Sequence, residues 1–91
     1  MQGLKTEGAW TVLPDLAKDR HASLNLKIGR RIYNARMRAQ MSQKTLGIHS
    51  KLTQAQIWDF EHGKTGVKVS YLIRIAAALG VSPSSLIEGL A

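Results

Sequence analysis

Residues 42–64 contain two short helical patterns separated by only a few residues, and no other feature limits the fold of this chain as strongly. Ser42 is a favourable N-cap for a helix that we expect over Gln43–Ser50. Leu46 is the inward apolar residue of this helix. The helical pattern breaks around His49–Leu52, which predicts a tight turn between the two helices.

The second pattern begins directly after this turn. Thr53 can cap a helix over Gln54–His62, in which Ile57 and Phe60 lie three positions apart on one face. Gly63 is placed to end this helix. Two short helices joined by a tight turn form a helix-turn-helix, and a second helix with a polar outer side fits the major groove of DNA.

The outward positions of the second helix carry side chains that suit the edges of bases. A glutamine can bond N6 and N7 of adenine together, an aspartate can accept from N4 of cytosine, and an alanine can touch the methyl group of thymine. We therefore predict base contacts from Gln54, Ala55, Gln56 and Asp59. An ordinary solvated helix face is the alternative, most of all for Asp59, because a carboxylate near phosphates is unfavourable without a specific donor.

The charge of the chain agrees with a polyanionic partner. The 91 residues include 13 Lys and Arg against 6 Asp and Glu, which gives a formal net charge of +7. Solubility alone is a sufficient reason for such a charge, but together with the helix-turn-helix pattern it favours DNA. We predict phosphate contacts from six residues in and around the two helices: Gln43, Lys44, Thr53, Lys64, Thr65 and Lys68.

Other classes of function find little support. Cysteine is absent and the three histidines are scattered, so neither a disulfide framework nor a metal site is expected. No cofactor motif and no catalytic arrangement of side chains stands out, which argues against an enzyme. No apolar run approaches the ~20 residues of a membrane-spanning helix, and residues 1–25 lack the apolar stretch of a signal peptide. These features predict a cytoplasmic protein without a cofactor.

From residue 26 onward the pattern is helical and predicts one small all-α domain over residues 26–91. Five helices are expected: Leu26–Ala39, Gln43–Ser50, Gln54–His62, Tyr71–Leu79 capped by Ser70, and a last helix opened by Ser82 and Pro83 that runs to about Leu90. Outside the helix-turn-helix, the inward residues are Ile28, Ile32, Ala35, Leu72, Ile75, Ala76, Leu79, Leu86, Ile87 and Leu90.

Residues 1–25 differ from this domain because they contain two glycines, a proline and no sustained periodicity. We expect a partly ordered N-terminal arm, with Trp10, Val12 and Leu13 as a small apolar cluster.

Three motifs follow one another in a characteristic order: SQxxL at 42–46, an isoleucine four residues before ExG at 61–63, and IAxALGVSxxxL at 75–86. With these motifs, the segment from Leu26 to Leu90 resembles the Cro/CI-type (Xre-like) helix-turn-helix repressors of phages, plasmids and bacterial chromosomes. The resemblance implies a five-helix, lambda-repressor-like domain that binds operator DNA, usually as a dimer, and regulates transcription. In such repressors the positions matching Gln54, Ala55 and Asp59 face the bases.

The resemblance also assigns roles to residues away from the recognition helix. It implies that Gln43 contacts phosphate and that Arg36 pairs with Glu61 inside the domain, as a structural pair. The chain departs from the family at the turn, where glycine usually stands at the position of Lys51 because that position tends to need a positive φ.

Two further questions stay open at this level. An antitoxin or similar interaction protein could use the same domain on its own operator and the arm to bind a protein partner. A homodimer could form through the last helix, with Leu86, Ile87 and Leu90, or through the apolar cluster of the arm. Trp58 lies off the face of Ile57. Its packing on the loop or the arm is the simplest expectation, and stacking on a sugar or contact with a partner are the alternatives.

Overall fold

The computed structural model describes the backbone of residues 3–90 and the side chains of residues 21–90. Within this range the chain forms four α-helices, a short 3-10 helix and no β-strand: α1 (Gly3–Arg38), α2 (Gln43–Ser50), α3 (Gln54–Glu61), α4 (Val69–Leu79) and η1 (Pro83–Leu86). The predicted all-helical class is confirmed. No helix of the described part is long and apolar enough to cross a membrane.

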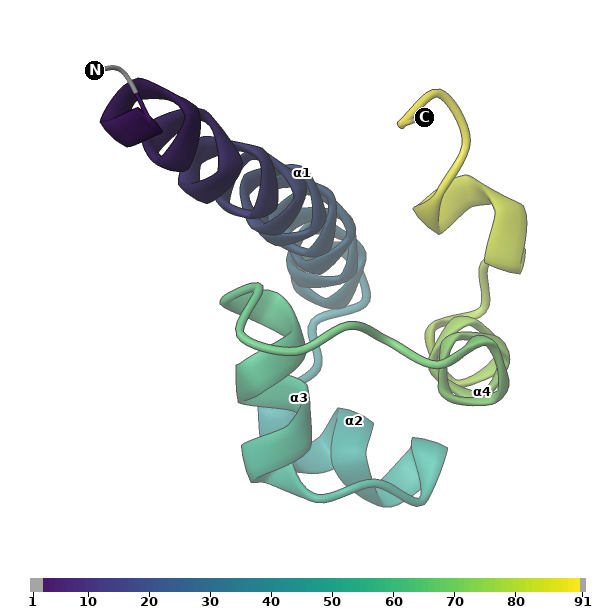
Figure 1. The fold of residues 1–91 in the computed structure, drawn as a ribbon. Helices are drawn as coiled ribbons and strands as arrows, with labels where there is room; N and C mark the ends of the chain where they lie inside the picture. Colours follow the sequence, from purple (N-terminus) through teal and green to yellow (C-terminus); the bar gives the residue numbers. More distant parts are fainter. Residues whose placement is uncertain (1–2, 91) are drawn as a thin grey trace.

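The core lies where the C-terminal part of α1 meets the other helices. α1 packs chiefly against α3, α2 packs against both α3 and α4, and η1 closes the core against α4 and α1. Figure 1 shows α2 and α3 as two short helices beneath the end of α1, with α4 to one side. The largest fully buried apolar side chains come from all five elements: Ile32, Leu46, Ile57, Ile75 and Leu86.

The inward residues were predicted well except in the last segment. Ile28 is partly buried against the core, and Ala35, Phe60, Leu72, Ala76 and Leu79 are buried within it. Ile87, predicted to face inward, is exposed, and Leu90 is half-buried.

α1 is much longer than the helix expected over Leu26–Ala39. Ser23 and Asn25, whose side chains could cap a helix that starts at Leu26, lie inside α1. Residues 15–25 contain no glycine or proline and are rich in good helix formers. Once the core holds α1 from Ile28 onward, adding residues at its N-terminal end requires only propagation and no new nucleus. Figure 1 shows this first part of α1 extending beyond the other helices. The side chains of the apolar cluster predicted at residues 10–13 lie outside the described residues.

α4 begins at Val69, two residues before the expected start. Ser70, predicted to be its cap, lies in its first turn, and Lys68 is the N-cap without a side-chain cap bond. The Leu72 N–H donates to the Lys68 carbonyl at 2.9 Å, so the helical ladder starts ahead of Ser70. The other end is as predicted, because Gly80 has a φ of 72° and stops the helix.

The expected fifth helix is a single 3-10 turn. Ser82 caps it as predicted and accepts from the Ser85 N–H at 3.3 Å. The Ser85 hydroxyl donates to the Ser82 carbonyl at 2.6 Å, and Gly89 has a φ of 76°. Serine hydroxyls compete with the helical ladder for backbone partners, and a positive φ leaves the right-handed helix. The chain therefore turns after Leu86 and does not continue as a helix to Leu90.

A close approach between α1 and α3 fixes the position of α3. A Cβ atom placed on Gly29 would lie 2.0 Å from the carbonyl oxygen of Phe60, a separation that no side chain tolerates. Gly63 ends α3 as predicted, with a φ of 67°, and a Cβ there would lie 2.8 Å from Cα of Leu26. The two glycines let the end of α3 lie directly against the backbone of α1.

Candidate nucleic-acid interface

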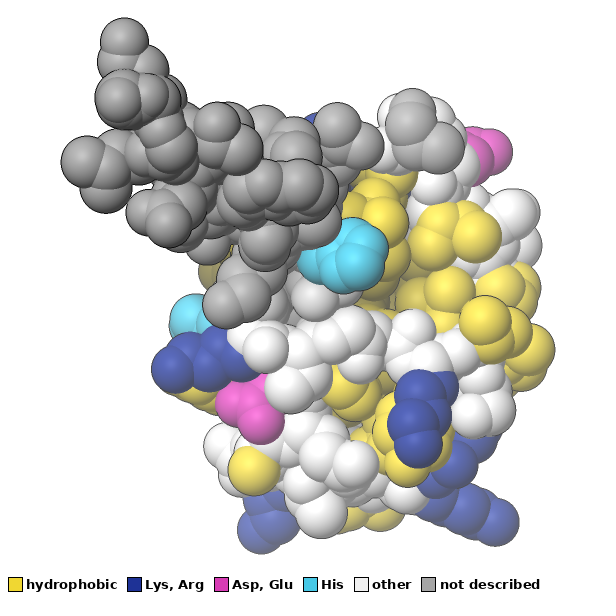
Figure 2. Space-filling model, in the orientation of Figure 1, with side chains coloured by type: hydrophobic (Ala, Val, Ile, Leu, Met, Phe, Trp, Pro, Cys, Tyr) yellow, Lys and Arg dark blue, Asp and Glu magenta, His cyan; other side chains and the backbone are white. Residues whose placement is uncertain are grey.

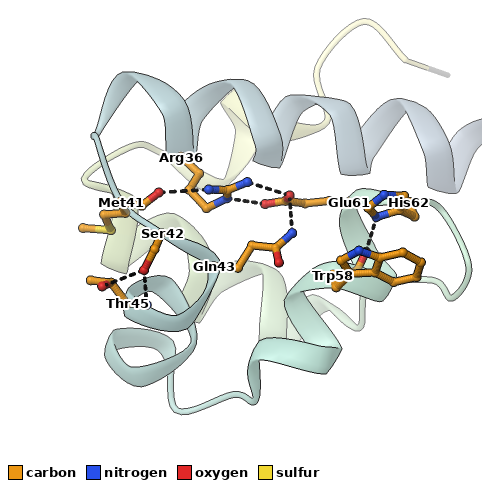
Figure 3. Close-up of polar contacts among 8 residues, drawn as sticks. All are labelled: Arg36, Met41, Ser42, Gln43, Thr45, Trp58, Glu61 and His62. Carbon is orange, nitrogen blue, oxygen red and sulfur yellow. Dashed lines mark hydrogen bonds and ion pairs between the residues drawn. The ribbon is translucent and has the colours of Figure 1, made fainter.

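α2 begins with a hydroxyl cap. Ser42 Oγ accepts a hydrogen bond from the Thr45 N–H at 3.0 Å and satisfies one of the free amides in the first turn. The same hydroxyl donates to Thr45 Oγ1 at 2.9 Å (Figure 3). Leu46 is buried, as predicted, and holds α2 on the core.

The turn between α2 and α3 has the left-handed conformation that usually favours glycine. Lys51 has a φ of 58° and a ψ of 42°. A non-glycine residue adopts this conformation at a cost of on the order of 1 kcal/mol. Arg74 of α4 donates from Nε to the Ser50 carbonyl at 2.8 Å and from Nη2 to the Lys51 carbonyl. These two bonds hold the strained turn against α4.

α3 begins with a reciprocal cap. The Gln56 N–H donates to Thr53 Oγ1 at 3.0 Å, and the Thr53 N–H donates to Gln56 Oε1 at 2.9 Å. The Thr53 hydroxyl also donates to Gln56 Oε1, at 3.2 Å. This capping box fixes the direction in which α3 leaves the turn. It also occupies the Thr53 hydroxyl and the Gln56 carbonyl, two groups that the sequence assigned to DNA.

The far end of α3 is held by a buried ion pair. Arg36 of α1 donates from Nε to Glu61 Oε2 at 2.6 Å and from Nη2 to Glu61 Oε1 at 2.9 Å. The side chains of Arg36 and Glu61 are only 10% and 2% exposed. The hydrogen bond with Glu61 raises the pKa of Arg36 above its ordinary value, against the opposing effect of burial. Arg36 Nη1 also donates to the Met41 carbonyl at 2.9 Å, so the pair joins α1, the chain before α2, and α3 (Figure 3).

Gln43 completes this network. Its Nε2 donates to Glu61 Oε1 of α3 at 3.0 Å, and Gln43 is half-buried. The sequence assigned Gln43 to phosphate, whereas in the structure its side-chain amide donates a hydrogen bond to the carboxylate of Glu61. Its backbone N–H, at the first position of α2, is available to an anion.

The side of α3 away from the core faces outward. Ile57 and Phe60 are buried against the core, while Gln54, Ala55 and Trp58 are exposed. Asp59 is half-buried beside them. Because residues four positions apart lie on the same face of a helix, the exposed side chains form one stripe along α3.

Comparison with known proteins agrees with this geometry. The family of the helix-turn-helix domain matches residues 27–87 of the chain. The protein belongs to this family. A solved structure, the restriction-modification controller protein C.AhdI from Aeromonas hydrophila, is 29% identical and superposes with a TM-score of 0.71. The match covers 72% of this chain and 96% of that one. No curated protein matches the sequence.

The helix-turn-helix domain and the likeness to a controller protein indicate DNA-binding transcriptional regulation. The resemblance to Xre-type regulators, first inferred from three short motifs, is thereby confirmed.

Four residues assigned to phosphate from the sequence lie on α2 or in the segment between α3 and α4. Lys44, Lys64, Thr65 and Lys68, all assigned to phosphate from the sequence, are exposed. Lys64 Nζ lies 5.3 Å from the ring centroid of Trp58, and Lys68 Nζ lies 5.7 Å from that of Tyr71. Figure 2 shows Lys and Arg side chains spread over the lower part of the molecule, where α2 and α3 lie.

Trp58 lies off the face of Ile57, as predicted, and is exposed. Its ring stacks on that of His62, with centroids 3.8 Å apart and planes inclined by 19° (Figure 3). It packs on its own helix, and it shares the outward face with Gln54. The spacing of four residues from Gln54 to Trp58 was the signal in the sequence.

Proposed function

We propose that this protein is a transcriptional repressor that binds a two-fold symmetric operator as a homodimer. The observation that carries the proposal is the outward stripe of α3, exposed along its length and held at both ends by the Thr53–Gln56 capping box and the Arg36–Glu61 pair. A recognition helix held in this way can enter a major groove without first becoming ordered, so its side chains meet the bases in one register. The protein would act in the cytoplasm, on bacterial, phage or plasmid DNA.

Within this proposal, Gln54 and Ala55 are the principal base contacts. Gln54 is the first residue of α3, and in docked helix-turn-helix proteins the N-terminal residues of this helix reach the base edges. Asp59 contributes only where a cytosine amino group meets its carboxylate. Gln56 retains its Nε2 donors for a base, since only its carbonyl is used in the cap.

Phosphate contacts would come from both sides of the stripe. Lys44 precedes it on α2, and Lys64, Thr65 and Lys68 follow it in the loop to α4. Gln43 would contribute through its backbone N–H, because its side chain is bound to Glu61. Thr53 would contribute only if the capping box opens, since its hydroxyl both donates and accepts within that cap.

A dimer places two such stripes on neighbouring turns of DNA. Leu86 is 2% exposed and belongs to the core, so of the apolar residues expected in the last helix, Ile87, at 44% exposed, is the better candidate for an interface. Val69 and Ile73 of α4 are also exposed apolar residues, four positions apart on one face. We assign the dimer contact to this C-terminal side of the domain.

Selection of binding sites from a random DNA pool tests the proposal. A two-fold symmetric consensus with half-sites about 34 Å apart is expected, together with a complex of two protein chains per duplex in sedimentation. Ile87→Glu should shift this complex toward one chain per duplex, whereas Glu88→Lys, its exposed neighbour, should not. Failure to select any consensus would contradict the proposed function.

Two alternatives follow from other observations. α1 extends upstream of the matched segment 27–87, and this extension would bind a toxin if the protein were an antitoxin. A stable complex with a co-expressed neighbouring gene product would favour this alternative. The match to C.AhdI favours a second one, in which the regulated genes encode a restriction-modification system. Operators found upstream of such genes would support it.

A further inference from the structure

The proposed base contacts leave one side chain of the outward stripe without a role. Trp58 follows Gln54 by four positions and Ala55 by three, so all three lie on the same side of α3. Trp58 is 39% exposed, although tryptophan has the largest apolar ring system of any side chain. If this face of α3 lies against DNA, the exposed ring is stabilised most by contact with an apolar group of the DNA.

Contacts within the protein hold the indole in one orientation. The imidazole of His62 stacks on it at 3.8 Å between centroids, and His62 Nδ1 lies 2.8 Å from the Trp58 carbonyl oxygen. The ring is therefore positioned before any DNA binds, and little rotamer freedom is lost on contact.

The chemistry of the stripe changes along its length. Gln54 offers a polar amide at the N-terminal end, Ala55 and Trp58 offer apolar groups in the middle, and Lys64 lies beside the indole beyond the C-terminal end. In the major groove the apolar feature is the C5 methyl group of thymine. With a rise of 1.5 Å per residue, Trp58 lies about 6 Å along the helix from Gln54, or roughly two steps of stacked base pairs.

We propose that Trp58 is a specificity-determining residue that recognises the methyl group of a thymine within about two base pairs of the base that Gln54 contacts. The inference rests on the proposed function and adds to it a second kind of readout. Hydrogen bonds from Gln54 select one base, and apolar contact with the indole selects a thymine nearby.

Deoxyuridine provides a direct test, because it pairs like thymidine but lacks the methyl group. Each thymine of one half-site in the selected operator is replaced in turn, and the affinity of wild-type protein is measured for every duplex. At one position we expect an affinity about fourfold lower, which corresponds to ~0.8 kcal/mol for one buried methyl group. Trp58→Gln should bind the thymine and deoxyuridine duplexes with equal affinity at that position.

Control variants separate readout from folding. Trp58→Phe keeps an apolar ring and should keep the sensitivity to deoxyuridine, as should His62→Ala, which removes the stacking partner and its contact with the Trp58 carbonyl oxygen. Thermal melts establish that each variant is folded before its affinity is measured. Ala55→Gly should leave unchanged the effect of deoxyuridine at the position assigned to Trp58. A deoxyuridine effect that Ala55→Gly abolishes belongs instead to a thymine that Ala55 contacts.

The outcomes distinguish this inference from the proposed function. If wild-type protein selects a consensus but no deoxyuridine effect depends on Trp58, the inference is wrong and the proposed function stands. A uniform loss of affinity in Trp58→Gln on all duplexes would place the indole against the sugar-phosphate backbone, which also overturns it. If no consensus is selected, the inference and the proposed function fail together.

Discussion

Arg36 and Glu61 face each other across the α1–α3 junction, and the guanidinium bonds both carboxylate oxygens in a nearly closed site. Gln43 and the Met41 carbonyl supply the remaining partners. A buried charge without its partner is strongly unfavourable, so the two side chains act as one unit in the stability of the domain.

We expect Arg36→Ala and Glu61→Ala each to lower the free energy of unfolding by about 3–5 kcal/mol, because each leaves an unmatched buried charge. In a small domain of marginal stability, such a loss amounts to a large part of the total. Chemical denaturation measures the change. Arg38→Ala, an exposed arginine on the same helix, is the control and should be nearly neutral. Wild-type stability with lost DNA affinity in Arg36→Ala would instead assign this arginine to phosphate.

The close contact at Gly29 gives a second prediction. Gly29→Ala should destabilise the fold by roughly 1–3 kcal/mol through overpacking, although alanine is the better helix former. The new methyl group would meet the Phe60 carbonyl. Gly66→Ala makes the same chemical change where the new Cβ would lie 3.4 Å from Asn25 Oδ1, an ordinary contact distance, and should be tolerated. Equal melting temperatures for the two variants would show that the α1–α3 approach can relax.

Lys51 gives a prediction of the opposite sign. Lys51→Gly removes the strain of the left-handed turn and should stabilise the protein by about 1 kcal/mol. For a domain of this size, that corresponds to a rise in melting temperature of roughly 4–8 °C. Lys51→Ala removes the same charge but keeps a Cβ, so it should not show the gain. An equal rise for both variants would trace the effect to charge and not to backbone strain.

Binding experiments should distinguish a residue that contacts bases from a residue that contacts phosphate. Gln54→Ala should weaken binding to the selected site by about 1–3 kcal/mol and change binding to a scrambled duplex little. Lys64→Ala should weaken binding to both duplexes similarly and reduce the salt slope by about 1. Fluorescence anisotropy on the two duplexes measures these differences. An equal loss on both duplexes for Gln54→Ala would exclude it as a base reader.

The helix-turn-helix itself was predictable from sequence because its determinants are local. Ser42, Thr53 and Gly63 mark helix ends by their chemistry, and Leu46 and Ile57 mark the buried face by their spacing. The remaining elements depend on competition between neighbours that a pattern does not resolve. The serines after Ser82 bond the backbone and shorten the last helix, and the lack of glycine and proline in residues 15–25 lets α1 continue upstream of Leu26.

The site was less predictable than the fold for a related reason. Gln43 and Gln56 suit DNA by residue type, but each has a partner within the protein that only the folded geometry brings within reach. Glu61 is distant in sequence from Gln43, and the cap at Thr53 turns Gln56 back toward the backbone. Trp58 shows the reverse case, since its size suggests packing in a core, whereas its position on α3 directs it outward.

The central claim is that the outward face of α3 reads a DNA sequence within a field of positive charge. The most direct measurement is the affinity of wild-type protein for the selected site and for a scrambled duplex of the same composition, over a series of salt concentrations. We predict an affinity at least about 10³-fold higher for the selected site. For both duplexes, log K should fall steeply with log salt, at about −0.9 per phosphate contact. Equal affinities for the two duplexes, or binding that does not respond to salt, would contradict the account.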